Sequence, residues 1–401
     1  MLLPVAYWLG RDGESTSAPS PSRSPSQAPA SDPSEAPSSW ANVQTFGATP
    51  DDDVDDTAAI QKAIDSKRFP AEDYKVKGGT VFFPKGHYKV EKPLVADRSV
   101  SLTLLGEGGQ VAGFENPPAS LLTYTGAGSE PFFSARSTAG FTVRNMGVRY
   151  NNKGFTGDLF DFSHTEPFDT SPDTSYVMID NSLIAGEYPV NSARSLLSFF
   201  DAITSTVRDS HLAWAQRGID GKRAPGYGFS NGIRIDSNAF DNLRVGAITN
   251  PGQSWVITSN VFEAINILEG ASLSRAVYDE LPERSPGDAS TISGLKFSGN
   301  WLGDATLSVH DVWITSEKSR FIGAEITGNF FGGGNVGIRL NTYVEGISIS
   351  GNYFEAAVAA IDLGPVPGNG INIAGNSIHA PTPIANADNG SQNLNITGNR
   401  R

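Results

Sequence analysis

The chain has 401 residues with 43 Gly, 25 Pro and no Cys, and its 43 acidic against 30 basic side chains give a net charge of −13. Apolar residues make up 38% of it, and with glycine added this is near the share found in globular domains, so disorder throughout the chain is excluded. The lack of cysteine excludes disulfides, thiolate metal sites and cysteine nucleophiles. The excess of acid argues against a nucleic-acid partner, because phosphate binding needs clustered Lys and Arg.

The first forty residues differ in composition from the rest. Residues 1–10 (MLLPVAYWLG) are apolar but too few to span a bilayer core of about 30 Å, and we interpret them as the end of a signal or anchor segment. Residues 11–40 contain ten Ser and six Pro, a composition that predicts a disordered linker because it buries too little apolar surface. We therefore expect an extracellular protein, secreted or tethered to the cell surface, with one folded domain over residues 41–401.

Residues 41–95 predict an N-terminal cap and a first coil. An acidic pair at 55–56 precedes AAIQKAID (58–65), whose apolar residues recur at helical spacing. The run GGTVFFPKGHYKV (78–90) predicts two strands around a Pro-Lys-Gly turn. A short helix at this place would cover the open end of a solenoid, whose unpaired strand edge otherwise invites aggregation.

The rest of the domain contains an internal repeat marked by asparagine. Four of the six steps between its members are 22 to 24 residues long, and each unit contains two short runs of alternating apolar residues. Such units must stack to bury their apolar faces, which predicts a parallel β-helix with an amide ladder along the stack. The members are Asn238, Asn260, Asn300, Asn329, Asn352, Asn376 and Asn399, with a weaker phase upstream at Asn145, Asn181 and Ser210.

The run VQTFGATPDDDVDDTAAIQKAID (43–65), followed by GGTVFFPKGHYKV, resembles the opening of the pectate-lyase-superfamily β-helix proteins, which include rhamnogalacturonase- and epimerase-like enzymes. The resemblance implies an all-β fold, a single-stranded right-handed parallel β-helix, acting on a polysaccharide. It does not fix the reaction, because hydrolases, lyases, epimerases and binding proteins share this opening. The motifs that mark polygalacturonases and classical pectate lyases are absent.

Side chains at one position of successive coils form a column on the outer face of a β-helix. Alternation along each strand predicts the column Asp161, Asp201, Asp220, Thr249, Glu269, His310 or Asp311, Arg339 and Asp362. We predict that Asp201, Asp220, Glu269 and Asp161 are the catalytic residues, because stacked carboxylates resist joint ionisation and so suit acid–base chemistry.

The spacing of two catalytic carboxylates decides the stereochemical course of a glycosidase. Adjacent coils place carboxylates about 5 Å apart, as in retaining enzymes, and Asp201 with Asp220 fits this case. Coils two steps apart place them about 9.6 Å apart, close to inverting enzymes. Asp161 with Asp220, or Asp220 with Glu269, fits that second case.

Substrate-binding residues are expected beside this column. Trp214 and Tyr227 offer aromatic faces for sugar rings, and Arg217 lies three residues before Asp220 in the sequence. His310, Asp311 and Arg339 complete the predicted substrate-binding set. Long insertions at 151–176 and 271–292 flank the column, and long loops are often functional.

Three functions remain open from the sequence. The first is a glycoside hydrolase, or a related glycosyl-transferring enzyme, which uses two carboxylates and requires no cofactor. The second is a polysaccharide lyase with Ca²⁺ held by Asp161, Asp201 and Asp220 and with Arg217 or Arg339 as the base. The third is a glycan-binding adhesin without turnover. No His/carboxylate spacing matches a zinc site, and both a monomer and a homotrimer are compatible with the pattern.

Overall fold

The structure is a computed structural model that describes residues 39–68, 78–109, 118–163, 174–221, 230–263, 275–278, 291–303, 306–309 and 320–401. Residues 1–10 and nearly all of the predicted linker lie outside the described residues. Within the described part, no helix is both long and apolar enough to cross a membrane.

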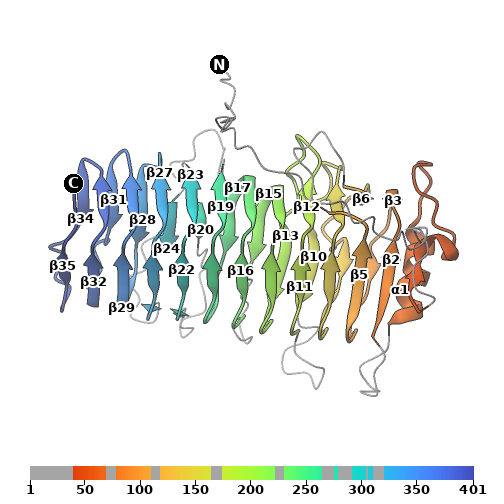
Figure 1. The fold of residues 1–401 in the computed structure, drawn as a ribbon, viewed down its shortest axis with the longest axis horizontal. Coiled ribbons are helices and arrows are strands. Elements are labelled where there is room, and N and C mark those ends of the chain that lie inside the picture. The colour runs from red at the N-terminus through yellow and green to blue at the C-terminus, as the bar shows by residue number, and fades with distance from the viewer. Residues whose placement is uncertain are drawn as a thin grey trace, which may run out of the picture. The chain divides into compact units, whose positions relative to one another are not determined.

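The domain is a right-handed parallel β-helix, as predicted (Figure 1). All strand pairs in the described residues are parallel, and each strand pairs with the equivalent strand of the next coil. This pairing follows from the repeat of about 23 residues, because a single coil cannot bury its apolar face alone. The strands form two long sheets.

The first sheet forms one flank of the solenoid. Its main row consists of β1 (Ala41–Asn42), β2 (Gly79–Phe83), β5 (Leu102–Gly106), β8 (Thr142–Arg144), β11 (Met178–Asp180), β14 (Thr206–Arg208), β16 (Arg234–Asp236), β18 (Val256–Thr258), β22 (Lys296–Ser298), β26 (Glu325–Thr327), β29 (Tyr343–Ser350), β32 (Asn369–Ala374) and β35 (Asn395–Thr397). The short strands β21 (Thr291–Ser293) and β25 (Arg320–Ile322) join it through β29.

The second sheet has two rows, and the long strands β15 (His211–Asp220) and β17 (Ala239–Thr249) run through both. The first row also contains β3 (Gly86–Val90), β6 (Ser120–Tyr124), β9 (Gly147–Tyr150), β12 (Leu183–Gly186), β19 (Val261–Glu263), β23 (Trp301–Gly303), β27 (Phe330–Gly332), β30 (Tyr353–Glu355) and β33 (Ser377–His379). The second row also contains β4 (Leu94–Val95), β7 (Phe133–Ser134), β10 (Asp158–Ser163), β13 (Ser195–Phe200), β20 (Arg275–Tyr278), β24 (Thr306–Val309), β28 (Val336–Leu340), β31 (Ala359–Asp362) and β34 (Thr382–Ala385).

A short helix caps the N-terminal end, as the sequence predicts. Helix α1 (Thr57–Lys67) lies beside β2 at the end of the solenoid in Figure 1 and follows the 3-10 helix η1 (Val43–Phe46). Its apolar face, with Ile60 and Ile64, packs into the core. The carboxylate of Asp55 accepts a hydrogen bond from the backbone N–H of Thr57, which satisfies one of the unpaired donors at the helix start.

The asparagine ladder is present over all seven predicted positions. In each step the side-chain amide donates to the Oδ1 of the next asparagine, and the six distances from Asn238 to Asn399 are 2.9 to 3.0 Å. Upstream the ladder continues through Ser210 and Ser182. Asn181 lies one residue before the ladder position and instead bonds Asn145 at 2.9 Å. These residues hold the turns between β-rows in register.

Candidate active site

The second row of the second sheet brings a column of residue positions into register. From Val95 of β4 the column runs through Ser134, Asp161, Ser198, Asp220, Thr249, Tyr278, Ser308, Arg339 and Asp362 to Ala385. Five members of the predicted column therefore share it: Asp161, Asp220, Thr249, Arg339 and Asp362. Their catalytic or binding roles stay predictions.

Asp201 does not belong to this column, so its predicted place there was wrong. It follows the end of β13 with φ of 53°, and Ser198 takes the register position between Asp161 and Asp220. The reason lies in the sequence of β13 itself. In SLLSFF, pairs of apolar residues stand on both sides of Ser198, so no strict alternation marks the outward face. The predicted adjacent-coil pair of Asp201 and Asp220 is therefore not formed.

Four predicted site residues, Glu269, Tyr227, His310 and Asp311, lie outside the described residues. In the coil after Thr249 the column position belongs to Tyr278, and in the next coil it belongs to Ser308. The predicted column places of Glu269 and of His310 or Asp311 therefore stay predictions.

Asp161 forms an ion pair with the guanidinium group of Arg136. Both Nε and one terminal nitrogen of Arg136 lie 2.8 Å from its Oδ2. The backbone N–H and hydroxyl of Ser163 donate to its Oδ1. Asp161 is only 2% exposed, and these donors compensate its burial because hydrogen bonds to the charged form stabilise it. The pairing also acts on Arg136: burial opposes its charge, but Asp161 outweighs this and raises its pKa.

Asp220 and Asp158 share one guanidinium. Arg194, in the turn before β13, lies 3.0 Å from Asp220 through one terminal nitrogen and pairs with Asp158 through the other. The other oxygen of Asp220 accepts hydrogen bonds from the hydroxyl of Thr249 and the amide of Asn250. Burial opposes the charge of Arg194, yet the two carboxylates outweigh burial and raise its pKa, so the guanidinium stays charged.

Ser198 lies between the two carboxylates of the column without a hydrogen-bond partner of its own. Its side chain is 0% exposed, and its Oγ makes no hydrogen bond. A buried hydroxyl without a partner costs about 1–3 kcal/mol, so such groups are rare outside functional sites. Sequence reasoning missed this residue, because a serine in the apolar run SLLSFF carries no signal of its own.

Trp214 and Arg217 lie on the same strand as Asp220. Trp214 has φ of 60° at the corner where β15 passes from the first row to the second, and its ring meets that of Tyr188 edge-on at 4.9 Å. Tyr188 is 69% exposed. Arg217 is half-buried and in register with Ser195 of β13. The binding roles predicted for these two residues stay predictions.

Arg339 and Asp362 belong to the same column as Asp161 and Asp220, but they lie apart from the candidate site. They lie next to each other, with Arg339 Nε 3.5 Å from Asp362 Oδ2. Four coils separate Arg339 from Asp220, which at the strand spacing is about 19 Å. This pair is thus a separate feature of the C-terminal half.

The predicted calcium ligands do not fit a calcium ion. Asp201 lies off the column, and the oxygens of Asp161 and Asp220 already accept hydrogen bonds from Arg136 and Arg194. Ca²⁺ requires six to eight oxygen ligands. In the described part of the chain, no group of three acidic or histidine side chains could hold a metal ion. The lyase with Ca²⁺ on this residue set is therefore not supported.

The sequence matches a protein-family model described as rhamnogalacturonase A/epimerase, pectate lyase-like, over residues 40–271, which is more than half of the chain. The chain belongs to this family. The matched region includes β10, β13 and β15, which carry Asp161, Ser198 and Asp220. No curated protein sequence matches the chain.

Solved structures with the same fold are remote in sequence. The catalytic unit of a GH87 alpha-1,3-glucanase from Streptomyces thermodiastaticus shares 14% identity, with 92% of this chain and 70% of that one covered and a TM-score of 0.53. The A-module of mannuronan C-5 epimerase AlgE6 from Azotobacter vinelandii shares 16%, with 90% and 98% covered and a TM-score of 0.50. ORF18 of Geobacillus virus E2 shares 13%, with a TM-score of 0.49; the match covers 84% of this chain and 60% of that one. The likenesses to the glucanase and to the epimerase module show the β-helix fold.

Proposed function

We propose that this protein is a glycoside hydrolase that cleaves a polysaccharide lying across β10, β13 and β15, with inversion at the anomeric carbon. The observation that carries the proposal is the placement of Asp161 and Asp220 in one column, two coils apart, with Ser198 between them. The family membership supports a carbohydrate substrate, and the expected setting is extracellular.

The spacing favours inversion over retention. Two coils correspond to about 9.6 Å between backbone positions, near the upper end of the carboxylate separation in inverting glycosidases. Such a gap leaves room for a water molecule beside the scissile bond. A retaining enzyme needs carboxyl groups about 5 Å apart, and the adjacent-coil position is the serine at 198, which cannot act as the second carboxylate.

In this proposal Asp161 has the role of general base and Asp220 the role of general acid. Asp161 pairs with Arg136 and accepts further hydrogen bonds from Ser163. Asp220 shares Arg194 with Asp158.

The other residues of the face bind substrate in this proposal. Trp214 and Tyr188 form an aromatic corner beside β15, and aromatic rings pack against the apolar faces of sugars. Arg217 donates to sugar oxygens from the register position next to Ser195. The hydroxyl of Ser198, which is buried and without a partner, holds a single water molecule between the two carboxylates in this proposal.

The test is a screen of neutral and uronic-acid polysaccharides that follows reducing ends and absorbance at 235 nm together, with and without EDTA. We expect new reducing ends without absorbance, unchanged by EDTA. Asp220→Asn and Asp161→Asn should each lower kcat about 10²- to 10⁴-fold, because each removes one acid–base group.

Asp201→Asn is the matched control, since it removes a carboxylate from the turn just after β13 without touching the column. It should leave kcat within about twofold. Absorbance at 235 nm that disappears with EDTA would overturn the proposal, as would equal loss of activity in Asp201→Asn and Asp220→Asn.

Glycan binding without turnover is the second candidate. It is favoured by the observation that every carboxylate oxygen of Asp158, Asp161 and Asp220 already accepts a hydrogen bond from a protein group. In that case Trp214→Ala weakens retention on an immobilised polysaccharide, while no polysaccharide releases reducing ends.

A further inference from the structure

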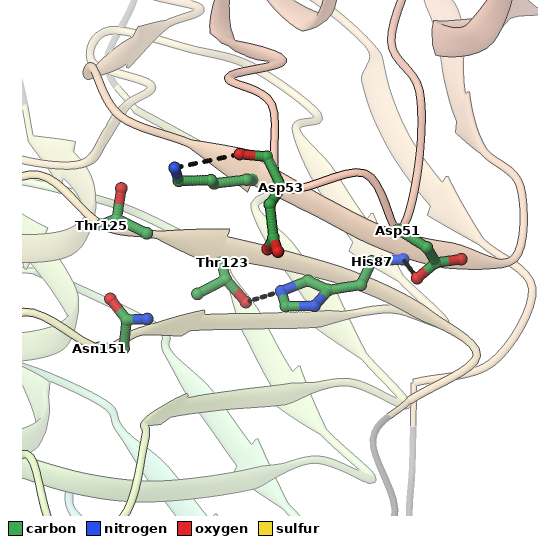
Figure 2. A pocket seen from close by; sticks show the side chains of 7 residues that line it. Asp51, Asp53, His87, Thr123, Thr125 and Asn151 are labelled. Atoms are coloured by element: carbon green, nitrogen blue, oxygen red, sulfur yellow. Dashed lines mark hydrogen bonds between the residues drawn. The ribbon is translucent and has the colours of Figure 1, made fainter.

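A polar pocket of about 320 Å³ lies at the N-terminal end of the solenoid, on the outer side of β3, β6 and β9 (Figure 2). Its charged and titratable lining comes from Asp51, Asp53, His87 and Lys89. Its neutral lining comes from Thr123, Thr125 and Asn151. The volume lies at the lower end of the range for small-molecule sites.

The loop before α1 forms one wall and is tied to β3. Asp51 Oδ1 accepts a hydrogen bond from the backbone N–H of His87 at 3.0 Å, and Lys89 donates to the backbone oxygen of Asp53 at 3.2 Å. A side chain at Gly86 would meet Pro50 at 2.3 Å, so glycine permits this close approach. The wall is therefore fixed by the fold.

Asp53 is exposed and supplies a carboxylate acceptor to the pocket. No described residue donates a hydrogen bond to its carboxylate, and Figure 2 shows this group pointing toward His87 and Thr123. A carboxylate accepts two or more hydrogen bonds in the ionised form. A ligand with neighbouring hydroxyl groups matches that capacity.

His87 contributes as a neutral ring. Its Nε2 lies 2.6 Å from the hydroxyl of Thr123. Burial, followed by the charge of Arg149, lowers its pKa despite the carboxylates of Asp51, Glu187 and Asp53. Lys89 remains charged, because its hydrogen bond to Glu91 raises its pKa. The lining itself has two carboxylates, one ammonium and a neutral imidazole, a net charge of −1. Beside it, Arg149 donates to Thr123, and Glu91 and Glu187 pair with Lys89 and Arg149, so the surroundings are negative as well.

We propose that this pocket binds one neutral pyranose unit of the polysaccharide, with the carboxylate of Asp53 accepting two of its hydroxyl groups. The lining offers both donors and acceptors and no apolar ring, which suits a polyhydroxyl ligand. Its net negative charge disfavours uronic acids and phosphates. A metal ion is disfavoured as well, because this pocket has only two carboxylates and one of them is held by His87. The proposal rests on the proposed polysaccharide substrate.

The inference is tested by titrating the full chain with methyl glycosides and following binding by saturation-transfer NMR. The glycosides are those of glucose, galactose, mannose and rhamnose. We expect one of them to bind, and Asp53→Asn to weaken it about tenfold or more, since hydrogen bonds to a charged group are lost. Asp53 has φ of 58°, a conformation that asparagine also adopts, so the variant folds. Asp52→Asn, with the same charge change outside the pocket lining, should bind as the unsubstituted chain does.

Absence of binding by all four glycosides would overturn the inference, as would equal binding by Asp53→Asn and Asp52→Asn. Stronger binding of methyl galacturonate or of Ca²⁺ than of any neutral glycoside would overturn it too. The two proposals fail separately. Asp220→Asn should lower kcat for polysaccharide cleavage about 10²- to 10⁴-fold and keep the binding of methyl glycosides. Asp53→Asn should weaken the binding of methyl glycosides about tenfold or more and leave kcat for polysaccharide cleavage unchanged.

Discussion

Two half-buried arginines at the candidate site differ in the carboxylates with which they pair. Arg136 forms an ion pair with Asp161 and also lies near Asp97 and Glu130, whereas Arg194 forms ion pairs with both Asp158 and Asp220. The two guanidinium groups compensate the burial of these carboxylates, which otherwise costs stability. In the proposed reaction, Asp161 is the general base and Asp220 the general acid.

His87 predicts a pH dependence of stability. Burial and Arg149 lower its pKa in the folded protein, so below about pH 6.5, the usual value, the unfolded chain binds a proton that the folded chain does not. Stability therefore falls as the pH drops from 7.5 through 6.5 toward the folded-state pKa. His87→Gln should flatten this part of the profile in urea unfolding at pH 7.5 and 5.5. An unchanged slope would contradict the assigned pKa shift.

The outward position of a single residue could be predicted from the sequence where polar and apolar residues alternate clearly along the strand. Asp161, Asp220 and Arg339 share the predicted column, because each stands beside an apolar residue that points inward. Asp201 was misplaced because SLLSFF, the sequence of β13, lacks a strict alternation of polar and apolar residues. Arg136 and Arg194 were missed, since their pairing with carboxylates more than 20 residues away depends on which coils stack.

At the scale of an element, the asparagine ladder fixes one turn of every C-terminal coil. Asn329 illustrates its bonding: its amide donates to Phe297 O at 3.0 Å and to Asn352 Oδ1 at 2.9 Å. Its Oδ1 accepts from both the backbone N–H and the amide of Asn300. The side chain is 2% exposed, so no water replaces a lost partner.

We expect Asn329→Ala to lower the free energy of unfolding by about 3 kcal/mol, because several buried groups lose their partners. Asn399→Ala is the control at the open, half-buried end of the ladder, where water takes over the bonds, and it should cost less than about 1 kcal/mol. Urea unfolding followed by circular dichroism measures both. Equal losses in the two variants would show that the interior of the ladder contributes nothing beyond its end.

The repeat made these elements predictable, and its interruptions limited the prediction. Seven ladder positions and the capping helix follow from spacing and composition. The column positions in the coils with long insertions could not be predicted in this way, because an insertion hides which short apolar run continues the column. There the register passes through Tyr278 and Ser308, neither of which the alternation pattern selects.

At the scale of the whole domain, the β-helix turns residue spacing in sequence into a linear array of positions about 4.8 Å apart. The candidate site occupies three neighbouring coils of that array, and the Arg339–Asp362 pair lies about four coils further along. The pocket of Asp53 and His87 lies toward the N-terminal cap. An extended polymer suits such an array better than a small compact substrate does.

The stereochemical course of hydrolysis tests the central claim most directly. The enzyme is added to a polysaccharide that it cleaves, and proton NMR of the anomeric region is recorded within minutes. The spectrum reports the anomeric configuration of the first product. The two-coil separation of Asp161 and Asp220 predicts inversion, with the opposite anomer appearing first and the original anomer only later through mutarotation. First formation of the anomer with the substrate's own configuration would mean retention, and would contradict the assignment of these two carboxylates.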